Sequence, residues 1–323
     1  MTPLSAKAFT AVVAILVGVG GVWAYFLAGD AVLEHVVPSR LRAPLRAWLF
    51  VGPAIALVGV FLVFPFVATI WTSIVEDGGF VDNYRFALTD RAMLIAFRNN
   101  VLWLVLGTGG SVLIGLVFAG LVDRVKREAL AKTFIFLPLA ISFVGASVIW
   151  RFVYAWRPAG EPQIGIVNAI VTGLGSEPVP WIQTPWLNTF ALIAIMVWLQ
   201  TGFAMVILSA AIKGVPSEVM EAARIDGANE RQLFVRVVLP MIRGTVLTVA
   251  TTIFIAILKV FDIVYVMTGG KFETEVVANR MFSEMFRFRN FGRASALAVV
   301  LLVVVVPVMV LNIRRLRTQG FRA

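Results

Sequence analysis

Seven long apolar segments follow one another along the chain, with polar stretches between them. They cover about residues 8–28, 46–72, 99–122, 133–154, 187–212, 246–268 and 295–313. A helix needs about 20 mostly apolar residues to cross the hydrocarbon core of a bilayer. The segments are too continuous for the alternating strands of a membrane barrel. The pattern therefore predicts an all-α membrane protein, a polytopic bundle of about seven transmembrane helices.

The composition agrees with this prediction and narrows the chemistry. The chain is 60% hydrophobic and 14% charged, whereas soluble domains average about 45–50% apolar and about 25% charged residues. Although the net charge is +10, the Lys and Arg residues form no single basic and aromatic face, so we expect no nucleic-acid partner. Cysteine is absent and His35 is the only histidine, which leaves little for disulfides, metal ligation or nucleophilic catalysis. We expect no bound cofactor, no metal and no enzyme activity.

Basic residues predict the orientation, because they collect on the cytoplasmic side of membrane proteins. With seven spans, one side holds sixteen Lys and Arg residues, at 40–46, 124–132, 213–243 and 314–322. The other side holds nine, at 85–98, 157 and 271–293. The first side is therefore predicted to be cytoplasmic, with the C-terminus inside and the N-terminus outside. Only Lys7 precedes the first segment and no clean small-x-small cleavage site follows it, so we predict a retained helix rather than a signal peptide.

The connection 155–187 is the longest predicted on the outside, and it is rich in Pro, Gly and Trp. Pro and Gly favour turns, while the apolar residues 164–174 suggest a short interfacial helix. The loop is either a plain interfacial connection or a contact surface for an external partner.

A polar insert, "EVMEAARIDGANERQLFVRVVLP" (residues 218–240), lies between the fifth and sixth segments. Ser217 is the expected N-cap of a first helix, and Glu218 and Glu221 suit its first turns. Gly227 is a suitable C-terminal stop. The sequence therefore predicts a first short helix that ends at an Asp-Gly-Ala corner.

A second short helix should follow the corner. Asn229 can cap it, and Gln232, three residues later, completes a capping box. Leu233, Phe234, Val237 and Val238 give this helix an apolar face at helical spacing. Pro240 then stands where the chain re-enters the membrane.

This insert resembles the cytoplasmic signature loop of binding-protein-dependent ABC importers. The matching residues are Glu221, Ala222, Ala223, Asp226, Gly227, Ala228, Leu239 and Pro240. In that family the loop docks into a groove of the ATPase subunit, and the resemblance implies the same ATPase-coupling role here. Two alanines would allow close entry into a groove, and Glu221 could pair with a basic group. The alternative is an ordinary amphipathic connecting helix.

The resemblance extends over about residues 45–318. Residues 136–156, 197–216 and 258–277 are similar to the carbohydrate-uptake branch, to its larger, maltose-type permease subunit, and in texture to its α-glucoside transporters. This implies the type I ABC importer permease fold over 46–318, with coupling helices at 214–243. An extra N-terminal transmembrane helix and linker (1–45) would precede it, and a cytoplasmic tail (319–323) would follow. The large periplasmic insert of the maltose-type subunit has no room here.

The resemblance also implies partners and a location. The partners are a dimer of ATPase subunits, a second permease subunit in a heterodimer, an external sugar-binding protein and membrane lipid. The location is the bacterial cytoplasmic membrane. The chain has no G-x-x-x-x-G-K-[ST] phosphate loop, so Mg-ATP is expected on the partner ATPase.

Polar residues inside the spans mark a candidate substrate path, because such residues are costly in lipid. Lys259 and Asp262 are three residues apart, share a face if the sixth span is one helix, and could pair. They either line the path or only fix helix packing. The resemblance adds positions on the fifth and sixth spans, beside Trp198 and Thr201: Met196, Leu199, Gln200, Phe203, Ile257 and Val260. Core packing is the alternative for these, and Trp103 and Asn100 are secondary candidates.

A different class of function is an ion-coupled secondary transporter that uses Lys259 and Asp262. We see no inverted repeat and expect no pair of broken helices, both of which are typical of such transporters. A membrane enzyme would have few residues for its chemistry. Co-purification of an ATPase subunit would discriminate between the importer and the ion-coupled transporter.

Overall fold

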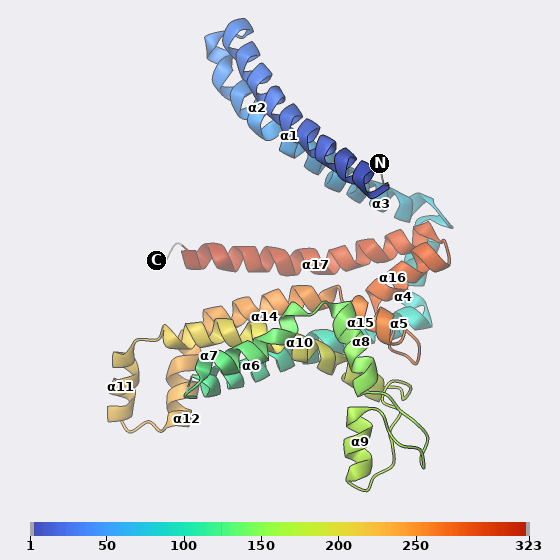
Figure 1. Ribbon diagram of the computed structural model, residues 1–323, viewed down its shortest axis with the longest axis vertical. Coiled ribbons are helices and arrows are strands. Elements are labelled where there is room, and N and C mark those ends of the chain that lie inside the picture. The colour runs from blue at the N-terminus through green and yellow to red at the C-terminus, as the bar shows by residue number, and fades with distance from the viewer. Residues whose placement is uncertain (1–2, 124, 321–323) are drawn as a thin grey trace. The chain divides into compact units, whose positions relative to one another are not determined.

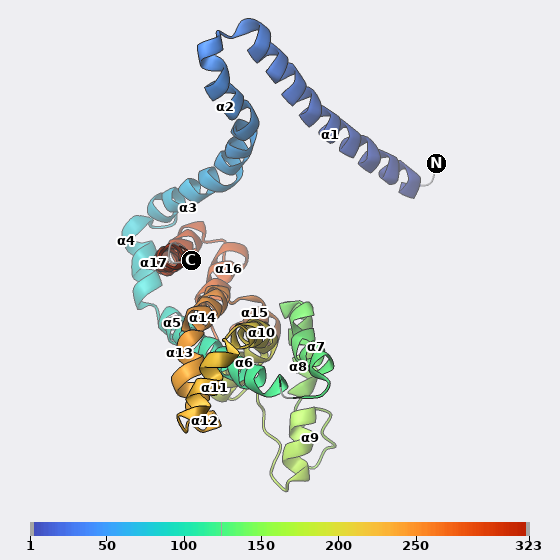
Figure 2. The ribbon, with the colours of Figure 1, turned by 90° about the vertical axis from the view of Figure 1, so that its left-hand side faces the viewer.

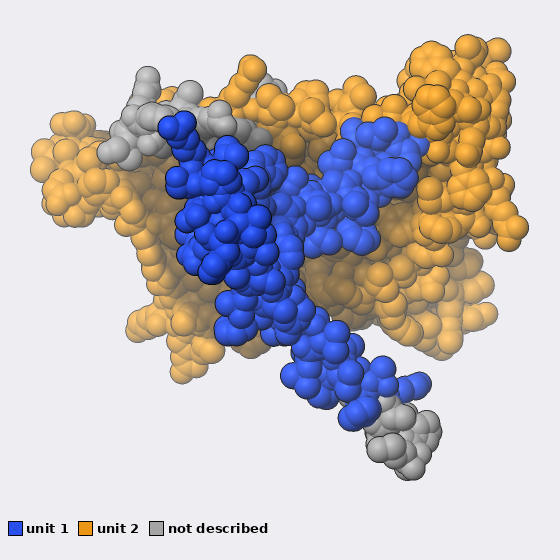
Figure 3. All heavy atoms as spheres, turned by 90° about the horizontal axis from the view of Figure 1, so that it is seen from above, with its two compact units in different colours: residues 1–69 blue, residues 70–323 orange. Residues whose placement is uncertain are grey.

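The computed structural model describes residues 3–123 and 125–320, and within these ranges every regular element is helical. Arg124 and residues 321–323 lie outside the described residues, as does most of the predicted tail. The chain divides into two compact units, residues 1–69 and residues 70–323, which are coloured separately in Figure 3. The predicted all-α class is confirmed.

Unit 1 is a helical hairpin followed by the start of a third helix. It contains α1 (Pro3–Val36), α2 (Ser39–Val58), the π-helical turn η1 (Gly59–Val63) and the first part of α3 (Phe64–Val75). The Phe26 and Phe50 rings stack with 5.0 Å between their centroids, and Arg46 forms an ion pair with Asp30 at 2.6 Å. These contacts join α1 to α2. The first helix ends at Val36, well past the predicted end at residue 28.

Unit 2 is built around α10 (Leu187–Lys213), whose residues are buried over more than half of its length. It packs against α6 (Thr108–Val122), α7 (Glu128–Phe136) and α14 (Arg243–Leu258). Small residues allow this close approach: a Cβ on Gly115 of α6 would lie 2.5 Å from the Cβ of Ala204. Small residues at helix crossings are the usual means of packing helices in a membrane.

The remaining helices of unit 2 surround or extend this core. Along the chain they are α4 (Gly79–Thr89), α5 (Arg91–Leu102), η2 (Trp103–Gly107), η3 (Leu137–Ala140), α8 (Phe143–Val153), α9 (Ile166–Gly173), α11 (Ser217–Ile225), α12 (Glu230–Leu233), η4 (Phe234–Val238), α13 (Leu239–Met241), α15 (Asp262–Met267), α16 (Val277–Phe282), η5 (Ser283–Arg287) and α17 (Phe291–Gly320). The helix predicted within 164–174 is α9.

Four described helices are long and apolar enough to span a membrane: Phe9–Val36, Ser39–Val75, Arg91–Val122 and Leu187–Lys213. Two bent helix pairs raise the number to as many as six, and Phe291–Pro307 is a shorter apolar helix. All seven predicted segments are therefore helical, but not all are single straight helices. One pair, Glu128–Ala140 with Phe143–Val153, bends by 103°, and the other, Glu230–Met241 with Arg243–Leu258, bends by 71°.

The expectation that no pair of helices would be broken is therefore wrong. At the first bend Pro138 lies in η3, where the ring removes a backbone donor, and Ser142 starts α8 afresh by accepting a hydrogen bond from the Gly145 N–H at 3.0 Å. The predicted sixth span is also interrupted, since α14 ends at Leu258 and α15 begins at Asp262. The carbonyl of Leu258 at this break accepts a hydrogen bond from the buried Asn100 side chain at 3.4 Å.

The two ends of unit 2 differ in their elements. In Figure 1, α10 runs along the bundle, with α11 and α12 near one end, and Figure 2 looks at the molecule from that end. We call this the insert end. In Figure 1, α9, α15 and α16 lie toward the opposite end, which we call the loop end.

Candidate functional site

The insert between α10 and α14 has the predicted helix-corner-helix form. The first helix, α11, ends in a Schellman motif: Gly227 N–H bonds to the Arg224 carbonyl and Ala228 N–H to the Ala223 carbonyl, both at 3.0 Å. Gly227 has φ +84°, a left-handed conformation that favours glycine. At the other end the prediction of Ser217 as N-cap is wrong, because Pro216 takes that place without a side-chain bond and Ser217 is already helical.

The second helix begins with the predicted capping box. The Asn229 side chain accepts from Gln232 N–H at 2.9 Å, and the Gln232 side chain accepts from Asn229 N–H at 3.0 Å. Arg224 of α11 and Glu230 of α12 form an ion pair across the corner at 3.1 Å. Leu233 and Val238 are the buried apolar residues of the insert, so local bonds shape it and apolar contacts anchor it.

The signature residues of the insert face outward. Glu221, Ala222, Asp226, Gly227 and Pro240 are exposed, and Ala223 and Leu239 are half-buried. Ile225 is also 85% exposed, a large apolar side chain beside the corner that the sequence analysis did not single out. Its only sequence signal is an isolated apolar residue in a polar stretch. The insert thus presents a small surface of apolar and charged side chains, suited to a protein partner.

The break between α14 and α15 opens onto a cavity of about 350 Å³. Lys259 directly follows α14, and Asp262 is the first residue of α15. The expectation that these two share one helix face is therefore wrong, although both line the cavity. They are joined there by Val260, Met196 of α10 and Phe143 of α8, of which Phe143 was not predicted.

The other predicted path residues are not all brought to this cavity. Trp198 lines a separate apolar groove of about 670 Å³ between α6, α7 and α10, together with Thr201. Leu199, Gln200 and Ile257 are buried, and Phe203 packs half-buried against the core. Ile257 packs against Gly107, where an added Cβ would lie 2.8 Å from its Cδ1 atom. Leu199, Gln200, Phe203 and Ile257 therefore have the surroundings of core residues.

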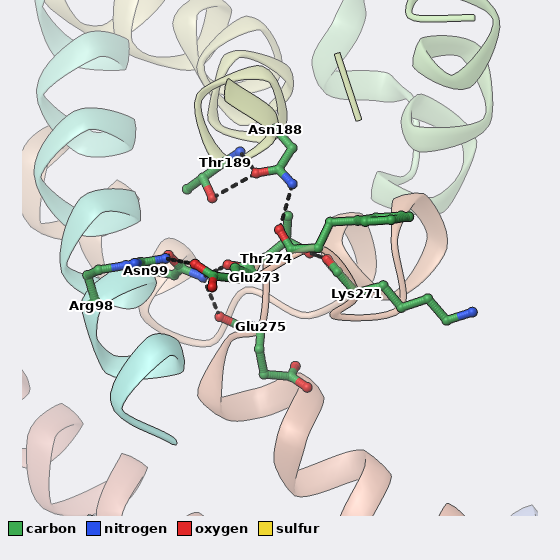
Figure 4. A network of polar contacts seen from close by, with 9 residues as sticks. Arg98, Asn99, Asn188, Thr189, Lys271, Glu273, Thr274 and Glu275 are labelled. Carbon is green, nitrogen blue, oxygen red and sulfur yellow. Dashed lines mark hydrogen bonds and ion pairs between the residues drawn. The ribbon is translucent and has the colours of Figure 1, made fainter. Parts of the chain in front are cut away.

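Buried asparagines hold the segment 268–277 at the loop end (Figure 4). The Asn99 amide of α5 donates to the Glu273 and Glu275 carbonyls at 2.7 and 2.8 Å. The Asn188 amide of α10 donates to the Phe272 carbonyl at 2.8 Å. Both side chains are fully buried. The sequence analysis missed these two residues, whose only signal is a polar amide beside a long apolar segment.

This segment carries strained backbone and a perturbed carboxyl group. Phe272 and Glu273 have φ +56° and +61°, which non-glycine residues rarely adopt. Burial raises the pKa of the Glu275 carboxyl above its ordinary value, and hydrogen bonds from the Asn279 side chain and the Val276 N–H oppose the shift. Arg98 stacks over the Trp186 ring at 4.1 Å and lies 3.6 Å from the Glu273 carboxylate. Such strain persists only where surrounding contacts enforce it.

The comparison with protein families decides what this arrangement belongs to. A family described as "Binding-protein-dependent transport system inner membrane component" matches residues 111–317, which include the cavity, α10 and the whole insert. The chain belongs to this family. It is a multi-pass inner-membrane permease of the ABC importer class.

Related proteins agree with the assignment of the permease. This chain is 59% identical to the "Osmoprotective compounds uptake permease protein GgtC" of Synechocystis, over 84% of this chain and 99% of that protein. It is 47% identical to the "Alpha-glucoside transport system permease protein AglF" of Rhizobium meliloti over 94% and 96% of the two chains. Among solved structures, a chain of a bacterial ABC transporter for the import of alginate matches with a TM-score of 0.72. At 20% identity over 85% of this chain and 97% of that chain, this match shows the fold alone.

Proposed function

We propose that the permease forms the translocation path of an ATP-driven importer for a carbohydrate, namely an α-glucoside or a maltose- or trehalose-like oligosaccharide. The support for the sugar is the 47% identity to an α-glucoside permease across nearly the whole chain. The "Trehalose/maltose transport system permease protein MalF" of Thermococcus litoralis, 26% identical over 87% of this chain, is also in line with it. The chain itself hydrolyses nothing, and Mg-ATP binds to a partner ATPase.

The exposed insert is the observation that carries the coupling role. In this proposal α11 docks into a groove of the ATPase subunit through Glu221, Ala222 and Ala223. The corner at Asp226 and Gly227 holds it away from the spans, and Leu239 and Pro240 lead back into the bundle. Ile225 adds an apolar anchor at the tip, because a buried apolar side chain commonly dominates an interface.

The cavity beside Lys259 and Asp262 is the proposed sugar site. An ammonium group donates hydrogen bonds and a carboxylate accepts them, so the pair can address several sugar hydroxyls. The volume of about 350 Å³ is within the range of about 300–1,000 Å³ of small-molecule sites. Val260 and Phe143 would contact the apolar faces of the sugar ring. Trp198, Leu199, Gln200, Phe203 and Ile257 have a packing role in this proposal.

The transport cycle would follow alternating access. Closure of the ATPase dimer pushes the insert, the spans rotate, and the cavity opens to an external sugar-binding protein. Hydrolysis then resets the cavity toward the cytoplasm. The insert end is cytoplasmic in this scheme, with the C-terminus inside and the N-terminus outside. The positive charges of 213–243 support that orientation. A second permease subunit completes the path, and residues 1–45 form an accessory segment outside the 46–318 domain.

The coupling role is tested with Glu221→Ala and with Gly227→Pro, since proline cannot adopt a positive φ. We expect both variants to lose the co-purifying ATPase subunit or sugar-stimulated ATP hydrolysis while the membrane fold stays intact. A matched control is Gly175→Pro, because Gly175 has φ +85° at the other end of unit 2. Unchanged assembly and hydrolysis in both insert variants would show that α11 is not the element that couples the permease to an ATPase.

A second candidate substrate is an osmoprotective compound, favoured by the 59% identity to GgtC. The two candidates are compared in proteoliposomes that hold the assembled importer and its external binding protein. Stimulation of ATP hydrolysis by maltose or trehalose, but not by glycine betaine, supports the carbohydrate. The reverse order supports a non-carbohydrate osmoprotective compound.

A further inference from the structure

Four charged side chains from three helices form a closed ring at the insert end. Lys132 lies 3.1 Å from Asp123 and 2.6 Å from Glu128, measured between the nearest nitrogen and oxygen atoms. Lys213 lies 2.5 Å from Glu128 and 3.7 Å from Asp123. Each carboxylate therefore meets both ammonium groups, and the ring has no net charge.

The ring is attached to the interior of α10. The Ser209 hydroxyl, which is fully buried, donates to Asp123 at 2.8 Å and contacts the Lys132 ammonium. Asp123 directly follows α6, Glu128 and Lys132 belong to α7, and Lys213 is the last residue of α10. The ring thus joins the end of α6, the first turns of α7 and the end of α10.

A second contact joins α7 to α10 nearer the middle of α10. A Cβ on Gly202 would lie 2.5 Å from the Ile135 carbonyl oxygen and 2.7 Å from the Phe136 Cα atom. The backbones of the two helices therefore touch at Gly202, two turns from Ser209 along α10. Two attachments at separate points along α10 restrain rotation of α7 more than either one alone.

These attachments lie on the direct route from the insert to the cavity. Lys213 comes four residues before α11 begins, and Val215 in the short connection is buried in the core. On the other side, α7 continues through η3 into α8, whose first residue, Phe143, lines the cavity. A displacement of α11 therefore has a short path through Lys213 and α7 to the cavity wall.

We propose that the ring of Asp123, Glu128, Lys132 and Lys213 makes α7 move as one body with the end of α10, so that a push on the insert reaches the cavity wall. This inference rests on the proposed docking of α11 on an ATPase. The four side chains are positioning residues in this scheme and touch neither the sugar nor the nucleotide. Without the ring, movement of the insert would be lost in rotation of α7.

A merely structural ring would neutralise charges near the membrane edge, and its loss would lower stability alone. The absence of cysteine allows the two roles to be separated. In Glu128→Cys/Lys213→Cys the ion pair is removed, and a short bifunctional thiol reagent can then join the same two helices covalently. The linker restores the attachment without restoring any charge.

The experiment uses the assembled importer, with cysteine-free partner subunits, and measures the ratio of substrate-stimulated to basal ATP hydrolysis. We expect the unlinked double variant to retain the ATPase subunit but to lose about fivefold or more of this ratio, the lower end of ordinary coupling between sites. Cross-linking should restore the ratio. As a control, Asp30→Cys/Arg46→Cys removes a 2.6 Å ion pair of unit 1 and should leave the ratio unchanged with or without the linker.

Two results would overturn the proposal. An unchanged ratio in the unlinked variant would show that the ring does not transmit movement. A linked variant that stays uncoupled would show that α7 and α10 must move apart, or that only the charges matter. Failure of the unmodified chain to retain any ATPase subunit would instead contradict the proposed function, and the two failures are therefore distinguishable.

Discussion

The main tertiary contacts at the two ends of unit 2 differ in kind, although the Arg98–Glu273 ion pair also lies at the loop end. At the insert end, charged side chains meet other charged side chains, and Lys213 of the ring is half exposed. At the loop end, fully buried amides from Asn99 and Asn188 bond to backbone carbonyls of one segment. An ion pair tolerates changes in distance because Coulomb attraction falls off gradually, whereas a hydrogen bond weakens steeply with distance and angle. The contacts at the insert end therefore tolerate small displacements better than the hydrogen bonds that fix the backbone at the loop end.

The largest expected effect follows from removing Asn99, one of the two buried asparagines that hold the segment 268–277 at the loop end. Asn99→Ala leaves the carbonyls of Glu273 and Glu275 without this donor in a partly buried place, where an unpaired group costs about 1–3 kcal/mol. We expect about 3 kcal/mol lower stability, measured by thermal unfolding in detergent. Asn229→Ala, which removes the cap of α12, is the control at the insert end and should cost only about 1 kcal/mol. Equal losses in the two variants would erase the contrast between the ends.

A smaller effect is expected from the corner of the insert. Gly227→Ala places a Cβ on a residue with φ +84°, at a cost of about 1–2 kcal/mol that is confined to the insert. Retention of the ATPase subunit should fall while the unfolding temperature of the bundle hardly changes. Gly175→Ala, with φ +85° and open space around it, imposes the same backbone cost in the connection before α10 and should not affect retention.

The stability of variants at the two ends should also respond differently to salt, and this effect is smaller still. Lys213→Gln removes two contacts of a partly exposed group, so we expect a loss below about 1 kcal/mol in dilute buffer. The difference from the unmodified protein should shrink at 1 M salt, where screening acts over about 3 Å. The effect of Asn99→Ala should depend less on salt, because its amide donates to two neutral backbone carbonyls and only its oxygen accepts from a charged group, Arg98. A salt-insensitive Lys213→Gln would contradict the electrostatic account of the ring.

The smallest effect concerns pH at the loop end. Because burial raises the pKa of Glu275 in the folded protein, the folded state holds a proton more tightly than the unfolded state. Its contribution to stability is present below the ordinary glutamate pKa and is lost as pH rises through the raised pKa. Glu275→Gln keeps an oxygen for Asn279 and Val276 but removes this dependence. Unfolding followed from pH 4 to pH 8 should therefore be flatter for the variant, while Glu273→Gln should retain the slope.

Local signals explain what was predicted correctly about the insert. The Schellman bonds link residues five apart or fewer, and the capping box links Asn229 to Gln232. Every partner lies within the same short stretch, so residue type and spacing sufficed. The wrong N-cap at Ser217 is an error of one residue, since Pro216 already supplies the extended conformation before the helix.

Partners far apart in the sequence explain what was missed or wrong. Asn99 bonds to a carbonyl 176 residues away, and Ser209 bonds to Asp123 across 86 residues. The break after Leu258 follows no proline or glycine signal, and the freed carbonyl is bonded by Asn100 of another helix. An apolar segment of suitable length therefore predicted one continuous helix where packing and a distant amide allow two.

The sequence by itself determined the helical class, the membrane location, the family and the shape of the insert. The helical class, the membrane location and the shape of the insert follow from composition, periodicity or hydrogen bonds between near neighbours, whereas the family follows from the resemblance carried by residues such as Glu221, Ala222 and Gly227. Only the tertiary structure decided which polar residues face the cavity, where the spans bend, and which charges close the ring at the insert end. The reason is that burial and distant pairing set the surroundings of Lys259, Asn99 and Lys213, and no local pattern encodes those surroundings.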